Sequence, residues 1–294
     1  DQAGNGEQLV IADPPVKFAS TSGELRLTHS FREGPRAHRI HASVRARAGD
    51  RRFDGSDSID LGPTSIFAPT TAQAPAFNFG EQQRDRVRQI IAGIAWEARW
   101  PGVGELSLGV QGTRYSKRIG LPSLPPVATD ASPVLYNATF AIEITPTLVA
   151  YAGTVTGLEE SGIAPGNAAN RNETLPAIAT RQRDAGLRWS ISEDVRLVAG
   201  LFDVRKPYFN LDANGRFDAL GEVINRGIEL SVSGPITRRL SIVAGGVLLW
   251  PRVTGEGVAL GRVGDRPVGA ISRRIEVNLD WRPPILEGLG VDMA

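Results

Sequence analysis

Hydrophobic and polar residues alternate along most of this chain, and the segment Thr180–Leu211 shows the pattern clearly. Within Ala185–Ile191 every second residue is apolar, and the residues between them are polar, charged or glycine. A period of two is typical of a β-strand with one apolar and one polar face. The turn Ser192–Asp194 leads to a second strand, Val195–Val204, after which we expect a long polar loop over Lys206–Glu222.

The same unit repeats and predicts about twelve strands, joined alternately by short turns and long loops. The other expected strands are Gly23–Arg32, Arg39–Ala48, Arg84–Trp100, Glu105–Tyr115, Leu135–Ile144, Leu148–Thr156, Val223–Ser233, Leu240–Trp250, Ala270–Trp281 and an unfinished Leu289–Ala294. The other long loops are Gly49–Gln83, Ser116–Pro133, Gly157–Ala179 and Pro251–Gly269. Many of these strands have the length of about ten residues that a tilted strand needs to cross a bilayer. The pattern predicts an all-β fold, an antiparallel up-and-down transmembrane β-barrel, with short turns in the periplasm and long loops outside.

Composition limits the class of protein further. The net charge is only +1 over 294 residues, so no strong field attracts nucleic acid. We find no run of about 18 apolar residues that would predict a transmembrane helix, and barrel strands escape such a search because they alternate. Cysteine is absent, which excludes disulfides and thiolate metal sites. The first residues, Asp1–Ala3, have no signal-peptide character.

Large aromatic residues gather near the ends of the expected strands. They are Phe31, Trp100, Tyr115, Trp250 and Trp281. Aromatic side chains in these places suit the two interfaces between a membrane and water. This distribution favours lipid as the surroundings of the apolar strand faces, with Leu187 near the middle of the membrane.

Catalytic and metal chemistry find little support in the sequence. His38 and His41 lie three residues apart on one strand, so their side chains point to opposite faces and cannot bind one metal ion. His41 and Ser43 share a face, which keeps an outer-membrane lipase as an alternative, but no Gly-x-Ser-x-Gly turn surrounds a serine. No glycine-rich loop between a strand and a helix predicts a nucleotide site. We therefore expect a protein that is not an enzyme and has no cofactor or metal of its own.

From Leu148 onward the chain resembles the barrel of TonB-dependent receptors, in particular those for ferric siderophores. The segments that carry the resemblance are Val149–Pro165, Val195–Asp203, Lys206–Asp212, Arg226–Gly234 and Arg273–Pro283. Their order and spacing cover about half of the chain. The resemblance implies energy-coupled uptake of an iron chelate across the outer membrane of a Gram-negative bacterium.

The resemblance also implies a 22-stranded barrel that is filled by an N-terminal plug with a TonB-contacting box. Neither part is visible in residues 1–294. We therefore expect a single barrel domain that is an internal fragment, roughly strands eight to nineteen. The TonB–ExbB–ExbD complex would act on the N-terminal part that precedes it.

Receptors of this kind bind their ligand between the plug and the outer loops, which gives candidate contact residues. By the third long loop these are Arg171, Arg181 and Arg183, and in the fourth they are Tyr208, Phe209 and Asn210. The planar guanidinium of arginine matches anionic chelates, and aromatic rings can stack on catecholate or hydroxamate arms. The alternative for each residue is a solvated loop side chain or a residue that lines the lumen.

Two other classes of protein stay open. A complete barrel of about twelve strands would be a passive, porin-like channel, and its first and last strands would pair. A soluble all-β protein would have strands of about six residues in two sheets packed around a dry core.

Overall fold

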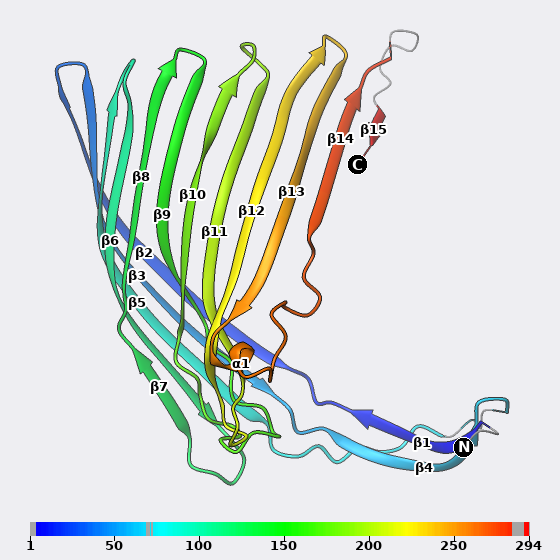
Figure 1. Cartoon of the computed structure of the whole chain (residues 1–294). Coiled ribbons are helices and arrows are strands. Elements are labelled where there is room, and N and C mark those ends of the chain that lie inside the picture. Colours follow the sequence, from blue (N-terminus) through cyan, green and yellow to red (C-terminus); the bar gives the residue numbers. More distant parts are fainter. Residues whose placement is uncertain (1–3, 69–70, 72, 284–290, 294) are drawn as a thin grey trace.

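The chain folds almost entirely into β-strands, as Figure 1 shows. The computed structural model describes residues 4–68, 71, 73–283 and 291–293. The elements are β1 (Asn5–Ala12), β2 (Lys17–Glu33), β3 (Arg36–Phe53), β4 (Asp57–Ser65), β5 (Gln83–Trp100), β6 (Gly104–Gly120), β7 (Val127–Ala131), β8 (Val134–Thr145), β9 (Leu148–Glu159), β10 (Ile178–Ser190), β11 (Arg196–Leu211), β12 (Phe217–Thr237), β13 (Leu240–Thr254), α1 (Glu256–Ala259), β14 (Arg273–Trp281) and β15 (Val291–Met293).

Twelve of these strands form one antiparallel sheet in the order of the chain, from β2 through β3, β5, β6 and β8 to β15. Each strand pairs with the preceding and the following strand of this series, which is the up-and-down topology that the sequence predicted. Strand β7 adds to the loop end of β6, and β1 pairs with β4 in a separate two-stranded ribbon. Short turns lie at one end of the sheet and long connections at the other (Figure 1).

Several expected loops contain more strand than the alternation indicated, and the expected loop Pro251–Gly269 begins with the last four residues of β13. Strand β11 continues to Leu211 and β12 begins at Phe217, so the long polar loop expected over Lys206–Glu222 is wrong. The real connection is the five residues 212–216. The Asp212 carboxylate accepts hydrogen bonds from the backbone N–H groups of Asn214 and Arg216, both at 2.8 Å, and Gly215 takes a positive φ of 71°. Because this turn is short, the polar ends of β11 and β12 pair as far as Leu211 and Phe217.

The other two corrections concern the first and second long loops. Gly49–Gln83 contains the end of β3 and all of β4, and Ser116–Pro133 contains the end of β6 and β7. Polar strands that leave the membrane lose the regular apolar period while their backbones still pair. The third expected loop, Gly157–Ala179, is confirmed over residues 160–177.

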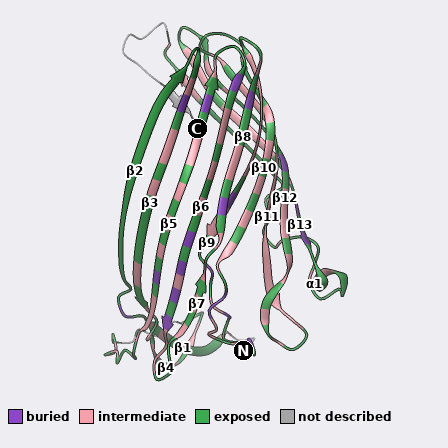
Figure 2. Ribbon diagram, turned by 90° about the vertical axis from the view of Figure 1, so that its left-hand side faces the viewer, coloured by how far each residue is buried: buried purple, intermediate pink, exposed green. Residues whose placement is uncertain are grey.

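The two faces of the sheet differ in chemistry and in exposure. In β10 the odd-numbered residues from Arg181 to Trp189 are all exposed, whereas the even-numbered residues 180–186 are half-buried. Side chains diverge on the outside of a curved sheet and converge on its inside, so the exposed, largely apolar face is the convex one. We call these the apolar face and the polar face. Figure 2 shows the same alternation of exposed and less exposed residues along the curved strands.

Large hydrophobic side chains on the apolar face have no protein cover in the described part of the chain. Ile275 is 80% exposed and Leu201 is 58% exposed, and many more on this face are similar. A soluble protein rarely exposes such a continuous apolar surface, so the soluble alternative does not fit. A lipid bilayer is the environment that covers this face, since the strands pair along their length as a membrane requires.

The sheet does not close on itself within the described residues. All seventeen residues of β2 are exposed, and no pairing joins β2 to β14 or β15. A complete twelve-stranded channel would pair its end strands, and the described residues show no such pairing. Within the residues that the structure describes, no helix is long and apolar enough to span a membrane.

The apolar face gives a direct test of membrane insertion. Leu187→Arg should reduce the free energy of unfolding from lipid vesicles by about 2–4 kcal/mol, because it places a charge at mid-membrane on the lipid face. Urea titration followed by tryptophan fluorescence measures this value. Gln182→Arg is the matched control, since Gln182 lies on the polar face of the same strand. Equal stability of the Leu187→Arg variant and the wild type would show that this face is not in lipid.

Candidate ligand-binding site at the loop end of the sheet

The segment 160–177, between β9 and β10, is a folded loop at the long-connection end of the sheet. Its base is closed by Ser161, whose hydroxyl donates a 2.5 Å hydrogen bond to the backbone oxygen of Leu175. Further along, the Ala164 N–H donates to the Glu173 backbone oxygen at 2.9 Å, and the Asn172 N–H donates to the Ala164 backbone oxygen at 3.0 Å. Ala164, Ala168 and Leu175 are buried. The loop therefore has a small core of its own.

A buried lysine ties the base of this loop to the sheet. Lys117 on β6 has a side chain only 5% exposed, and its ammonium donates to the backbone oxygen of Ser161 at 2.7 Å. The same group lies 3.1 Å from Glu160 on the loop and 3.2 Å from Asp85 on β5. A buried charge needs such partners, and removal of one partner leaves the others uncompensated. Lys117 thus joins the loop to two strands that are distant from it in the sequence.

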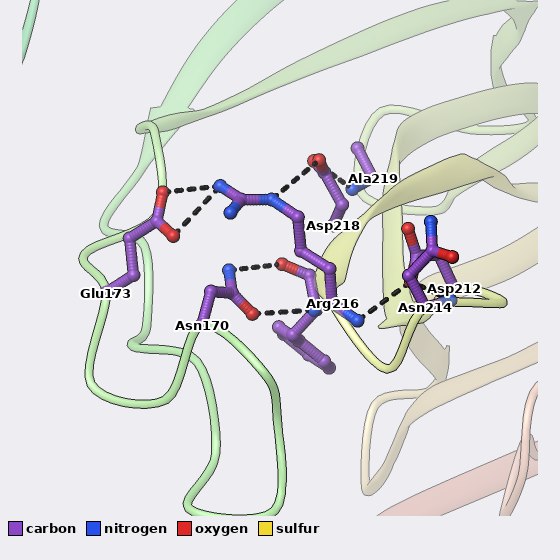
Figure 3. Close-up of polar contacts among 8 residues, drawn as sticks. Asn170, Glu173, Asp212, Asn214, Arg216, Asp218 and Ala219 are labelled. Atoms are coloured by element: carbon purple, nitrogen blue, oxygen red, sulfur yellow. Dashed lines mark hydrogen bonds and ion pairs between the residues drawn. The ribbon is translucent and has the colours of Figure 1, made fainter.

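The other side of the loop is tied to the turn between β11 and β12, as Figure 3 shows. The Asn170 side chain accepts a 2.8 Å hydrogen bond from the backbone N–H of Phe217 and donates a 3.1 Å bond to its backbone oxygen. Arg216 contacts both carboxylate oxygens of Glu173, at 2.7 and 2.9 Å. The Ala169 N–H also donates to the Gly215 oxygen at 2.7 Å. These contacts place residues 160–177 between β6 and the β11–β12 turn.

The end of β11 presents aromatic and amide groups beside this loop. On the polar face Asn210 donates a 3.0 Å hydrogen bond to the Tyr208 hydroxyl, and its own oxygen accepts one from the Leu211 N–H at 2.8 Å. Phe209 points to the other side and stacks on Phe217, with ring centroids 6.2 Å apart. The two faces of this strand end therefore have different roles.

A second lysine lies close to the loop end of β9. Lys206 on β11 is 3.5 Å from Glu159, which is the last residue of β9 and lies beyond the apolar band. The Thr180 hydroxyl donates a 2.7 Å hydrogen bond to Glu159 and is the main cause that lowers the pKa of this carboxyl group. Lys206 lowers this pKa as well, whereas desolvation by burial opposes both. Glu159 is therefore an ionised partner for Lys206, which itself is partly exposed.

The structure brings together some of the predicted site residues and separates others. Arg171 lies on the anchored loop, exposed, and makes no ion pair within the described ranges. Tyr208 and Asn210 lie on the polar face of β11, and Phe209 packs on the opposite side. Arg181 and Arg183 lie on the apolar face, because they share the odd-numbered positions of β10 with Leu187. This pair does not reach the polar side of the loop cluster.

Sequence reasoning missed the residues that hold the site together. These are Lys117, Asn170, Glu173, Lys206 and Arg216. One signal was present, because lysine is rare in this chain and its three lysines include both Lys117 and Lys206. The partners of both lysines come from other strands, so their roles depend on the strand order.

The arrangement presents polar and charged groups that a ligand could contact. Ionic and amide groups surround the loop, while clusters of three or more histidine, aspartate or glutamate residues that could hold a metal ion are absent from the described part of the chain. Exposed Arg171 and the Tyr208 ring are the groups that could face a ligand from the loop side, whereas Lys206 is already paired with Glu159.

Comparisons with known proteins agree on the fold. No protein-family model matches the chain, and no curated protein sequence is similar to it. Among solved structures it is similar to BauA, the ferric preacinetobactin receptor of Acinetobacter baumannii, with 20% identity and a TM-score of 0.73 over 95% of this chain and 43% of that one. The siderophore receptor PiuA of the same species has 15% identity and a TM-score of 0.76, with 94% and 45% covered.

A third similar structure is the ferric-catecholate import receptor Fiu from K12 E. coli. It has 16% identity and a TM-score of 0.72, and the match covers 90% of this chain and 42% of that one. At these identities the likeness establishes the fold. The chain spans less than half the length of each of these three receptors.

The anchoring of the loop can be tested by hydrogen exchange. Asn170→Ala removes two hydrogen bonds and leaves the Phe217 backbone groups without their partner, which should weaken the local stability of 160–177 by about 1–3 kcal/mol. Amide exchange in this segment should become faster by about tenfold or more. Arg171→Ala is the control, because it changes the same loop and breaks no anchoring contact. Unchanged exchange in the Asn170→Ala protein would mean that this contact does not hold the loop.

Proposed function

We propose that this chain is part of the barrel wall of an outer-membrane, TonB-dependent receptor that takes up ferric siderophores. The observation that carries the proposal is its likeness to ferric-chelate receptors over 90% or more of its length, at TM-scores of 0.72–0.76. The apolar face would contact the outer-membrane lipid of a Gram-negative bacterium. The polar face would line the lumen, and residues 1–294 would correspond to a barrel domain without its plug.

The anchored loop supports a binding role at the outer mouth. A loop that is held at both ends loses little conformational freedom when a ligand binds, so more of the interaction energy appears as affinity. Arg171 on this loop would contact an anionic ferric chelate, and Tyr208 and Asn210 on β11 would contact its organic arms. Phe209 supports this surface by packing against Phe217.

Arg181 and Arg183 have no part in this contact surface, because their side chains lie on the opposite face of β10. Transport in this proposal requires the TonB–ExbB–ExbD complex, which would act through an N-terminal part outside residues 1–294. In this proposal the ferric siderophore is the substrate.

Energy dependence distinguishes this proposal from a passive channel. Deletion of the gene should abolish uptake of iron from at least one ferric siderophore, and restoring the gene should restore uptake. Uptake should also stop when a protonophore collapses the proton gradient or when TonB is deleted. Uptake that continues under both conditions would support a passive, porin-like pore and contradict our proposal.

The role of Arg171 is tested by ligand binding. Arg171→Gln should weaken the binding of an anionic ferric tris-catecholate by about tenfold, since a hydrogen bond to a charged group contributes about 1.5–3 kcal/mol. Fluorescence quenching of the purified protein, titrated with this chelate, measures the affinity. Arg238→Gln, an exposed arginine at the short-turn end, is the matched control and should bind as the wild type does. If both variants lose affinity equally, Arg171 does not contact the chelate.

A further inference from the structure

Arginines concentrate on the apolar face just beyond its hydrophobic band, toward the long loops. The register aligns Arg183, Asp203, Arg226 and Trp250 in one row across β10–β13. The next row outward contains Arg181, Arg205, Ile224 and Arg252. Across these four strands the row on the other side, within the band, consists of the apolar residues Ala185, Leu201, Ile228 and Leu248. We call the two charged rows the arginine belt.

The arginine belt has an excess of positive charge. It holds five arginines and one aspartate, so its formal charge is +4 in a chain whose net charge is +1. Asp203 accepts hydrogen bonds of 2.7 Å from both Arg205 and Arg226. Arg181, Arg183 and Arg252 make no ion pair with any residue that the structure describes. Glu222, one row further out, is the next acidic residue on this face.

One part of the arginine belt forms a groove of about 630 Å³. Arg226, Arg252 and Arg266 line it together with the exposed ring of Trp250 and with Asp265. The Asp265 backbone oxygen accepts a 2.8 Å hydrogen bond from the Val253 N–H, and this bond holds the loop that bears Arg266 against the end of β13. Cationic and apolar groups thus share one depression.

The position of the groove determines what can reach it. Successive residues on one face of a strand are about 7 Å apart. The arginine belt therefore begins about 7 Å beyond the last apolar row, at the level of the lipid headgroups. A ligand in the lumen cannot reach these side chains, because they lie on the opposite face of the sheet. Guanidinium groups bind phosphate through paired hydrogen bonds, and tryptophan favours the same interface.

We propose that this groove binds the phosphate group of an anionic lipid in the outer leaflet of the membrane. Arg252 and Arg266 contact the phosphate, Arg226 adds charge from the neighbouring strand, and Trp250 packs against the adjoining apolar part of the lipid. Arg181 and Arg183 extend the phosphate-binding surface along the belt. The proposal rests on the fold and the register, and it does not depend on which substrate the receptor takes up.

Lipid binding to the purified protein tests this site. The protein, expressed within its complete reading frame and held in a neutral detergent, is titrated with short-chain phosphatidic acid, and bound lipid is counted by native mass spectrometry. Phosphatidylcholine of the same chain length is the net-neutral control, and glycerol 3-phosphate represents the soluble source of phosphate. We expect phosphatidic acid to bind and the other two to bind at least tenfold more weakly.

Substitutions at the groove test whether Arg252 and Arg266 contact the lipid phosphate. Arg252→Gln/Arg266→Gln should weaken the binding of phosphatidic acid about 30-fold, since each basic residue near a membrane surface contributes about a fivefold effect. Arg238→Gln/Arg239→Gln, two exposed arginines in the β12–β13 turn at the opposite end, is the matched control and should bind as the wild type does. Arg252→Lys/Arg266→Lys keeps the charge and should retain most of the affinity.

Three outcomes would overturn the proposal. The first is equal binding of phosphatidic acid by the wild type and the Arg252→Gln/Arg266→Gln variant. The second is binding of glycerol 3-phosphate as tight as that of the lipid, which would indicate a site for soluble anions. The third is a loss in the lysine variant as large as in the glutamine variant, which would indicate damage to local packing.

Discussion

The pairing of every long strand with its neighbours, while one face of the sheet stays apolar, is the constraint on which the structure depends. In hydrocarbon no water can satisfy a free N–H or C=O group, so each strand must bond along its length to the next. This requirement explains the up-and-down order, because a strand that returns after a tight turn finds its partner at once. The apolar face, with residues such as Leu201 and Ile275 largely exposed, is stable only where lipid covers it.

The same constraint decides which kinds of side chain lie on each face of the sheet. Charged and hydrogen-bonding side chains gather on the polar face or beyond the hydrophobic band, where ions are not removed from water. Lys117 is the main exception, since it is buried, and its charge is compensated by Asp85 and Glu160. That cluster joins the wall of the sheet to residues 160–177, and Asn170 joins this segment to the β11–β12 turn. The proposed binding surface is therefore part of a loop that ion pairs and hydrogen bonds hold to the sheet.

The strands and their order were predictable because period-two alternation is a local property that each segment carries by itself. The prediction was wrong where strands leave the membrane. At β11 and β12 the residues near Tyr208 and Phe217 are polar and aromatic without a regular period, and only backbone pairing with the neighbouring strand extends them. The ribbon of β1 and β4 follows the same principle, since its two strands stabilise each other outside the membrane with little apolar alternation. Candidate contacts on the loops were predicted only in part, because Arg181 and Arg183 were assigned by their nearness to a loop and not by the face of the strand on which they lie.

By itself the sequence determined the class of fold, the approximate number of strands in the main sheet, the position of the short turns and which residues share a face. Each of these follows from the two-residue period of an extended backbone. Only the tertiary structure decided which residues of different segments meet, such as Lys117 with Glu160, Asn170 with Phe217 and Arg226 with Trp250. The register between strands sets the last of these contacts, and the folding of the loop 160–177 against the sheet sets the first two.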